Sequence, residues 1–301
     1  MNGFISKIQR YSTKDGPGIR STVFLIECNL KCHWCSNPEL IDSGKKYFYF
    51  RERCVKCGNC VKVAINDSIK LTDNGCKIDR AKCTNISQCA DSCYYDAYEP
   101  VGFEISPIEL TEKLLRDKDF YDQSKGGVTF SGGEPALQPT FLIETAKLLR
   151  KSGIHIALDT AGLVAEEIMK EIASNVDLIL YDIKAFDSKL HKACTGKDNH
   201  GILNNAITMA KLNKPMIIRL TIVSEYNDDE NDFIARLNFV KKLGDAVQQI
   251  DIIKYHNFGE GKYVRLGMDN KARKLKEPSD GLIHKYANLA AKVAKKVTIN
   301  G

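Results

Sequence analysis

Short runs of β-branched and other apolar residues alternate with longer, helix-like patterns along most of this chain. Six of these runs predict β-strands, because each combines apolar and β-branched residues over a strand-like length. They cover residues 21–27, 127–131, 155–159, 176–182, 216–223 and 250–255. Strands that alternate with helices are typical of βαβ units around a parallel sheet. Six units rather than eight predict an α/β fold that is a partial (β/α)6 TIM-like barrel.

Each predicted strand is followed by a polar or glycine-rich tail. The six tails read CNLKC, GGEP, TAG, IKAFD, SEYNDD and HNFGEG. In a parallel α/β fold the carboxyl ends of the strands meet on one face, and functional residues gather there. We therefore expect the six tails to meet at one site.

Residues 46–103 break this alternation. The segment holds seven cysteines in short spacings and has little apolar periodicity, which predicts a small insert that is held together by metal. We expect two units: a barrel made of residues 1–45 and 104–301, and the insert of residues 46–103 after the first strand.

Composition and charge limit the possible functions. The sequence has 301 residues, of which 43% are hydrophobic, enough for a sizeable core. No apolar run reaches membrane-spanning length, and the first residues lack the order of a signal peptide, so we expect a cytoplasmic protein that does not bind membranes. The net charge of +6 comes from lysines spread along helical segments without interleaved aromatics. This distribution favours solvated helix faces and no nucleic-acid partner.

Ten of the eleven cysteines lie between Cys28 and Cys93. In a reducing cytoplasm such crowding favours metal or redox chemistry over disulfides. Cys28, Cys32 and Cys35 form a C-x3-C-x2-C triplet, which offers three thiolates where iron–sulfur clusters usually take four. One iron would then keep an open position for a small molecule, and a zinc site is the alternative for the triplet alone. Cys194 is isolated and is interpreted as an ordinary thiol.

Five ordered motifs resemble those of the radical S-adenosylmethionine (SAM) enzymes that activate glycyl-radical enzymes, the family of pyruvate formate-lyase activating enzyme. The motifs are DGPGIRSTVFLIECNLKCHWCSNPE (15–39), GGVTFSGGEP (126–135), LDTAG (158–162), YDIK (181–184) and YHNFGEGKYVRLG (255–267). The resemblance spans nearly the whole chain and points to the subgroup with a ferredoxin-like cluster insert.

The resemblance implies that Cys28, Cys32 and Cys35 hold a [4Fe–4S] cluster whose fourth iron binds SAM. One electron would cleave SAM to a 5′-deoxyadenosyl radical, which would take a hydrogen atom from a glycine of a partner glycyl-radical enzyme. Lys184 is grouped with these three cysteines as catalytic. The implied electron donor is of flavodoxin or ferredoxin type.

The resemblance also implies the residues that bind SAM. They are Trp34, Ser36, Gly132, Gly133, Glu134, Asp159, Thr160, Asp182, Ile183, Lys184, Arg219 and His256. The glycine pair lets the backbone approach the methionyl end, Glu134 receives its ammonium group, and His256 packs against adenine. The alternatives are a plain turn for Gly132 and Gly133, and helix caps for Asp159 and Asp182.

Two further family features concern the surroundings of SAM. The neighbourhood of Asp159 and Asp182 can also hold a monovalent cation. Asp15 is assigned to positioning of the glycine-bearing peptide, and a tight turn through Gly16 and Gly18 is the alternative.

The insert resembles a two-cluster ferredoxin, which repeats C-x2-C-x2-C-x3-C and exchanges the fourth cysteine between its two clusters. One set of four ligands is complete: Cys54, Cys57, Cys60 and Cys93. We therefore expect one insert cluster, since this spacing favours iron–sulfur over zinc. It would relay electrons or shape the surface toward the partner.

The second ligand set of the insert is incomplete. Ala64 and Ile86 stand at two of its expected positions, and Cys83 and Cys89 remain. Cys76 is off the pattern but nearby, so a second [4Fe–4S] cluster with three thiolates and another ligand stays open.

Two other functions are alternatives to the activating enzyme. A ferredoxin-type electron-transfer protein would carry clusters but would not cleave SAM, and the strand-end motifs speak against it. A radical SAM enzyme that acts on a small molecule would need no protein partner, and the family resemblance speaks against it.

Overall fold

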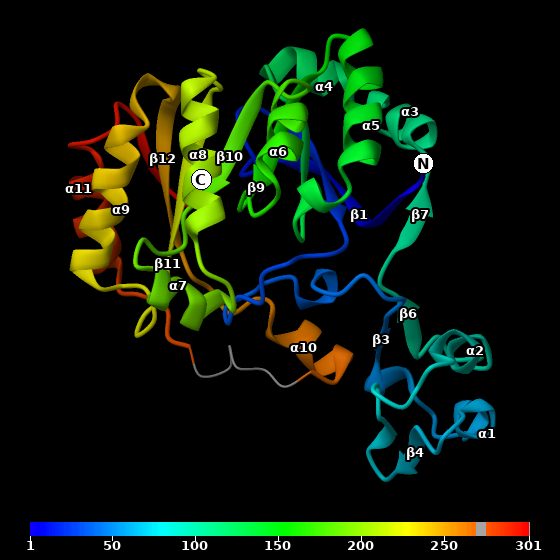
Figure 1. Cartoon of the computed structure of the whole chain (residues 1–301). Helices are drawn as coiled ribbons and strands as arrows, with labels where there is room; N and C mark the ends of the chain where they lie inside the picture. Colours follow the sequence, from blue (N-terminus) through cyan, green and yellow to red (C-terminus); the bar gives the residue numbers. More distant parts are fainter. Residues whose placement is uncertain (269–274, 301) are drawn as a thin grey trace.

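The computed structural model describes residues 1–268 and 275–300 and shows one large sheet with helices on its outer face (Figure 1). The six predicted strands are confirmed, and each pairs in parallel with the next along the chain. They are β2 (Arg20–Leu25), β8 (Gly127–Gly132), β9 (His155–Thr160), β10 (Leu178–Asp182), β11 (Met216–Ile222) and β12 (Val247–Lys254). The chain is therefore an α/β protein with a mainly parallel sheet, consistent with a partial barrel.

Three further strands widen this sheet to nine, beyond the six that the sequence predicted. β1 (Gly3–Ser12) pairs antiparallel with β2, and β7 (Phe103–Ile105) pairs antiparallel with β1. At the other edge β13 (Val297–Ile299) pairs in parallel with β12. Among the described residues no pairing joins β7 to β13, so the described sheet is open.

Amphipathic helices cover the outer face of the sheet (Figure 1). In α5, for example, Leu142, Ala146 and Leu149 recur at helical spacing and are fully buried, because they form the stripe that faces the strands. The helices of this layer and its connections are α3 (Pro107–Leu115), α4 (Lys118–Ser124), α5 (Pro139–Lys151), α6 (Glu166–Ala173), α7 (Ser188–Thr195), α8 (His200–Lys211), α9 (Glu230–Lys242), α10 (Glu260–Leu266) and α11 (Asp280–Ala290). Short 3-10 turns are η1 (Pro38–Leu40), η2 (Arg51–Arg53), η3 (Pro135–Leu137) and η4 (Gly244–Ala246).

Between β2 and β7 the chain forms two small sheets that are separate from the large one. β3 (Tyr47–Tyr49) pairs antiparallel with β6 (Tyr98–Pro100), and β4 (Ile69–Thr72) forms a hairpin with β5 (Gly75–Ile78). Two short helices complete the segment: α1 (Asn59–Val63) and α2 (Ile86–Asp91). In Figure 1 this segment lies beyond α10, at one end of the large sheet.

Arg265 of α10 joins this segment to the rest of the chain. Its guanidinium lies 4.4 Å from the ring centroid of Phe50 and 3.6 Å from the Glu52 carboxylate. Its carbonyl accepts a hydrogen bond of 2.9 Å from Arg80 Nη2. The segment is therefore anchored at a second place, away from the strands through which the chain enters and leaves it.

None of the helices that the structure describes combines the length and the apolar character that crossing a membrane requires.

A buried carboxylate ties the antiparallel edge of the sheet to the helical layer. Asp117, between α3 and α4, is only 2% exposed and accepts hydrogen bonds from Arg10 Nε of β1 (2.7 Å) and Ser21 Oγ of β2 (3.0 Å). The hydrogen bond from Arg10 lowers the pKa of Asp117, although burial acts in the opposite direction.

We predict that Asp117→Asn lowers the free energy of unfolding by roughly 1–3 kcal/mol near neutral pH, because it removes a charge-assisted hydrogen bond. Since the folded-state pKa of Asp117 lies below its unfolded value, its contribution is present above about pH 4 and fades as the pH falls through the lowered pKa. Denaturant unfolding of variant and parent near neutral pH and at about pH 3.5 tests this.

Asp122→Asn is the control for this prediction, because Asp122 is exposed and, within the described part of the chain, pairs only with Lys118. A destabilisation by Asp117→Asn that is equally large at both pH values would contradict the assignment.

Candidate functional site

A cavity opens where the carboxyl ends of the six parallel strands meet, as the tails predicted. Its volume is about 260 Å³. Five of the six tails contribute to its wall. The SEYNDD tail (224–229) does not, and Arg219 and Thr221 of the strand before it line the cavity instead. The lining residues are Cys28, Leu30, Cys32, Trp34, Cys35, Ser36, Asn37, Ile41, Ser131, Gly132, Gly133, Asp159, Thr160, Ala161, Asp182, Lys184, Arg219, Thr221, Ile253, Lys254, Tyr255 and His256.

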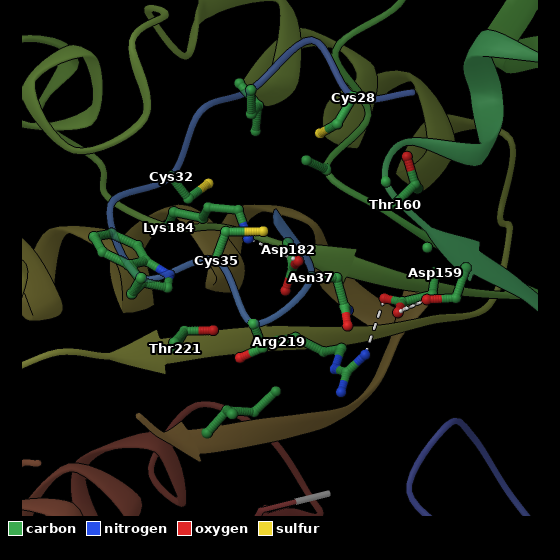
Figure 2. Close-up of a pocket in the computed structure, with 18 of the residues that line it drawn as sticks. Cys28, Cys32, Cys35, Asn37, Asp159, Thr160, Asp182, Lys184, Arg219 and Thr221 are labelled. Atoms are coloured by element: carbon green, nitrogen blue, oxygen red, sulfur yellow. Dashed lines mark hydrogen bonds and ion pairs between the residues drawn. The ribbon is translucent and has the colours of Figure 1, made fainter. Parts of the chain in front are cut away.

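The loop after β2 carries Cys28, Cys32 and Cys35 into this cavity, on the side opposite Asp159 and Arg219 (Figure 2). Backbone hydrogen bonds hold the loop to other parts of the chain. Cys28 N–H donates to the Ile41 carbonyl (2.9 Å), Lys31 N–H to that of Thr195 (2.8 Å) and His33 N–H to that of Cys194 (3.0 Å). The loop is therefore fixed along its length, and Cys194 is a buried free thiol beneath it.

The glycine pair after β8 touches the start of the cysteine loop. A Cβ on Gly133 would lie 2.2 Å from the Glu27 carbonyl oxygen, and one on Gly132 would lie 2.3 Å from that of Leu25. Gly132 also has a φ of +120°. Only glycine fits such contacts, so the pair lets the backbone of β8 pack directly against the chain that leads to Cys28.

Glu134 does not line the cavity, although the sequence interpretation placed its carboxylate on the SAM ammonium group. It is 1% exposed and accepts hydrogen bonds from Thr160 Oγ1 (2.6 Å), Ala161 N–H (3.0 Å) and Ala136 N–H (3.1 Å). Burial raises the pKa of this carboxyl, and the three donors oppose that rise. The carboxylate thus holds the end of β9 in place, because its oxygens are already engaged within the chain.

Asp159 and Arg219 form an ion pair on one wall, with Arg219 Nη1 2.9 Å from Asp159 Oδ1 (Figure 2). Ser131 Oγ donates to the other carboxylate oxygen at 2.7 Å. Burial lowers the pKa of Arg219, but Asp159 and two other aspartates outweigh it, so the net shift is upward. Arg219 Nε is buried and has no hydrogen-bond partner among the described residues.

Lys184 and Asp182 form the second charged pair of the cavity. Lys184 Nζ donates to Asp182 Oδ2 at 2.9 Å (Figure 2). Burial lowers the pKa of Lys184, yet the charge of Asp182 and its hydrogen bond raise it by more, so the ammonium group stays charged. Ile183, between these two residues, is buried in the main core and does not line the cavity.

His256, Trp34 and Ser36, which the family motifs assign to the nucleoside, form another part of the cavity wall. The His256 ring lies 4.2 Å from that of Phe258, measured between centroids. Gly259 follows closely, and a Cβ there would lie 2.9 Å from the Ser36 Cα, so the last tail packs on the backbone of the cysteine loop.

Asp15 lies outside the lining residues, in a loop that is tied to β2 and β8. Its carboxylate accepts from Thr22 Oγ1 (2.7 Å) and its carbonyl accepts from Thr129 Oγ1 (2.7 Å). The fully buried Arg20 holds the same loop, donating to the Pro17 carbonyl at 3.1 Å. The charge of Asp15 also contributes to the pKa shift of Arg219, which places it near the charged wall.

The sequence interpretation missed residues that support the cysteine loop. Lys262 of α10 donates to Asn37 Oδ1 (2.7 Å) and Glu39 Oε1 (2.5 Å), and Tyr263 OH donates to the Cys35 carbonyl (3.0 Å). Asn37 and Glu39 lie in the motif of residues 15–39, and Lys262 and Tyr263 lie in the motif of residues 255–267. Their place in these motifs was the signal from which a role at the site could have been inferred.

The cysteines of residues 46–103 divide into two groups. Five line one hollow: Cys54, Cys57, Cys60, Cys76 and Cys93. Cys83 and Cys89 do not line this hollow. They are buried in an apolar cluster that also includes Cys60, with Cys54, Cys76 and Cys93 packed against it.

The residues of the main cavity fit a [4Fe–4S] cluster together with the methionyl end of SAM. Burial raises the pKa of Cys28 and Cys35 to about 12, so the free thiols are protonated and cluster binding would displace their protons. Across residues 1–268 and 275–300 no three His, Cys, Asp or Glu side chains converge closely enough for a single metal ion. A [4Fe–4S] cluster instead needs one thiolate on each of several irons. The guanidinium of Arg219, which lines the cavity, suits a carboxylate.

Comparison with known proteins gives matches over most of the chain. Residues 87–237 match the family model of the Radical SAM superfamily. The trans-4-hydroxy-L-proline dehydratase activating enzyme of Clostridioides difficile is 36% identical over 292 residues, 96% of each chain. The benzylsuccinate synthase activating enzyme of Thauera aromatica is 35% identical over 87% of this chain and 81% of its own.

A solved structure is also similar. It is a domain of pyruvate-formate lyase-activating enzyme from Bacteroides vulgatus ATCC 8482, with 31% identity and a TM-score of 0.50. The similarity covers 58% of this chain and 99% of that one.

We predict that Gly133→Ala weakens SAM binding by roughly tenfold or more, because the added Cβ must displace the Glu27 backbone beside Cys28. Anaerobic equilibrium dialysis with labelled SAM measures the effect. Gly281→Ala is the matched control, because a Cβ at that helical position meets nothing within 4 Å. Unchanged SAM affinity in Gly133→Ala would contradict the role given to this contact.

Proposed function

This chain belongs to the activating enzymes of glycyl-radical enzymes within the Radical SAM superfamily, and we propose that its strand-end cavity holds a [4Fe–4S] cluster together with SAM. The observation that carries the proposal is the meeting of three cysteines and two charged pairs in one cavity. When bound, the cluster supplies the electron that cleaves SAM to the 5′-deoxyadenosyl radical, which takes a hydrogen atom from a glycine of the partner.

Cys28, Cys32 and Cys35 are the proposed ligands of this cluster. They share one loop. Hydrogen bonds join the backbone of this loop to η1 and the adjacent Ile41, to α7 and to α10. A loop fixed at several places keeps the three sulfurs in position while no cluster is bound, which reduces the cost of ordering them.

The charged pairs are the proposed contacts of the methionyl end of SAM. This end carries both an ammonium group and a carboxylate, and the cavity offers partners of both signs. The Arg219 guanidinium, which lines the cavity, is the proposed partner of the carboxylate. Asp159 and Asp182 are acceptors for the ammonium group or ribose hydroxyls, or ligands of a monovalent cation, and Lys184 keeps Asp182 oriented.

His256, with Trp34 and Ser36, forms the proposed contact surface for adenine. The ring of His256 lines the cavity and offers a flat face for stacking. Gly132 and Gly133 line the cavity beside β8, and their backbone is the proposed contact of the methionyl end.

A protein partner needs access to this cavity, and the open sheet supports such access. β7 and β13 are not paired to each other in the described sheet. The Asp15 loop lies near the charged wall and is held rigid by Arg20 and Thr129, so we assign it to positioning the glycine-bearing segment. The similar proteins named above are activating enzymes of a dehydratase and a synthase, and a glycyl-radical enzyme is the proposed partner class here.

Residues 46–103 are the proposed ferredoxin-like insert, with a cluster bound by Cys54, Cys57, Cys60 and Cys93. Their side chains line one hollow, and Cys57 is exposed. A cluster there would be accessible to a flavodoxin- or ferredoxin-type donor. Electron transfer alone does not explain the strand-end cavity, so an electron carrier is not favoured as the function of the whole chain.

We predict a glycyl-radical signal in electron paramagnetic resonance when the reduced, cluster-loaded protein and SAM are mixed anaerobically with its partner. The panel of candidate partners includes trans-4-hydroxy-L-proline dehydratase and benzylsuccinate synthase. Cys32→Ala should abolish both the signal and 5′-deoxyadenosine formation, because it removes a cluster ligand.

Cys194→Ala is the matched control, since this buried thiol lies beneath the loop but outside the cavity lining, and it should retain the signal. Formation of 5′-deoxyadenosine without a signal from any partner would show SAM cleavage and reject the tested partners. Absence of both from cluster-loaded protein would overturn the proposed function.

A further inference from the structure

The insert cysteines support a conclusion about cluster number that rests on the proposed function. A two-cluster ferredoxin pattern would take the second cluster's ligands from positions 64, 83, 86 and 89. In this chain these positions hold Ala64, Cys83, Ile86 and Cys89. Two thiols are too few for a [4Fe–4S] cluster, so the location of Cys76 decides whether a third is available.

Cys76 lies at the first site. Its sulfur is 3.5 Å from that of Cys60, and its backbone N–H donates to the Tyr49 hydroxyl at 2.7 Å. The β4–β5 hairpin places it there, because Cys76 pairs with Leu71 in a four-residue antiparallel ladder. The hollow that Cys76 lines is the one that contains Cys54, Cys57, Cys60 and Cys93. The off-pattern thiol therefore adds to the complete set and not to the incomplete one.

An asparagine side chain closes the place where the second site would be. Asn85 Nδ2 donates to the Val63 carbonyl at 2.9 Å, and Asn85 Oδ1 accepts from Ile65 N–H at 3.5 Å. These bonds lie on both sides of Ala64, the position of a missing ligand. The Cys89 thiol also donates to Asn85 Oδ1, at 3.8 Å. The amide thus joins α2 to the end of α1 across the space between two of the ligand positions.

Apolar packing occupies the remaining positions. Cys89 is fully buried and Cys83 is 8% exposed. Ala64 and Ile86 pack in the same apolar cluster, together with Ile69 and the tyrosines of β3 and β6. Ala64 and Ile86 offer no iron ligand, so only two thiols are present here. Four irons and four sulfides would also have to displace the apolar side chains packed around them.

We infer that the insert binds a single [4Fe–4S] cluster through Cys54, Cys57, Cys60 and Cys93, and that Cys76, Cys83 and Cys89 are not cluster ligands. Cys76 is a fifth thiol beside a ligand sulfur, a position from which hydrogen bonding tunes a cluster without binding iron. Cys83 and Cys89 form part of the apolar core that supports the site.

Iron and sulfide analysis of the anaerobically reconstituted whole chain, with Mössbauer spectra, tests this inference without an activity assay. We expect about eight irons per chain, four in the barrel and four in the insert. About twelve irons would overturn the inference by revealing a second insert cluster. A count of about four irons in the wild type that falls to none in the Cys28→Ala/Cys32→Ala/Cys35→Ala variant would also overturn it. That outcome would leave the barrel cluster of the proposed function standing.

Variants assign the ligands within the insert. In the triple-alanine background the remaining iron should stay at about four after Cys83→Ala/Cys89→Ala and after Cys76→Ala. The matched Cys54→Ala/Cys93→Ala pair should lose it. Loss of iron from Cys83→Ala/Cys89→Ala or from Cys76→Ala would overturn the ligand assignment. Since the wild-type count needs no substitution, the inference stays testable if a variant fails to fold.

Discussion

The pairing of β2 with β8 continues beyond the ends of both strands, and the cavity depends on this continuation. Gly133 N–H donates to the Leu25 carbonyl at 2.9 Å, and Glu134 N–H donates to that of Glu27 at 2.7 Å. Glu27 has a φ of +94°, a left-handed conformation that is costly for a residue with a side chain. The continued pairing holds the chain in that turn, and the turn directs Cys28 out of the sheet and into the cavity.

The charged groups of the cavity are arranged in balanced pairs. Asp159 with Arg219 and Asp182 with Lys184 each bring opposite charges within 2.9 Å, and all four side chains are largely buried. An isolated charge in such a place would be strongly unfavourable, so the pairs allow a polar cavity to persist inside the sheet. A ligand that carries both a positive and a negative group can pair with the aspartates and with the cationic side chains at once, so its binding leaves no charge uncompensated.

The parallel part of the fold was predictable because its signals are local. Each central strand is an apolar run that is buried on both faces, such as the segment at Met216–Ile222, and each is followed by a polar tail. β1 was missed because its last residues are largely polar and exposed, and β13 because it has only three residues. Pairing with a neighbouring strand, rather than local pattern, makes these segments extended.

The site was predictable to the extent that parallel strands bring their tails together. The thiols and the two charged pairs follow from that rule and from the motifs. The inward turn of Glu134 does not, since it depends on backbone donors at the end of another strand. The bond from Lys262 to Glu39 joins residues 223 positions apart, and the place of Cys76 depends on how a hairpin packs. No spacing within the sequence records such contacts.

The chain enters and leaves its cysteine-rich segment through two strands that lie side by side. Tyr47 pairs with Pro100 and Tyr49 with Tyr98, so the two ends of the segment are neighbours in space. A segment attached in this way lengthens one connection without altering the register of the large sheet. In evolutionary terms the whole segment is an insertion that can be gained or lost as a unit. One of its two sets of cluster ligands can also be lost, and neither change alters the cavity of the barrel.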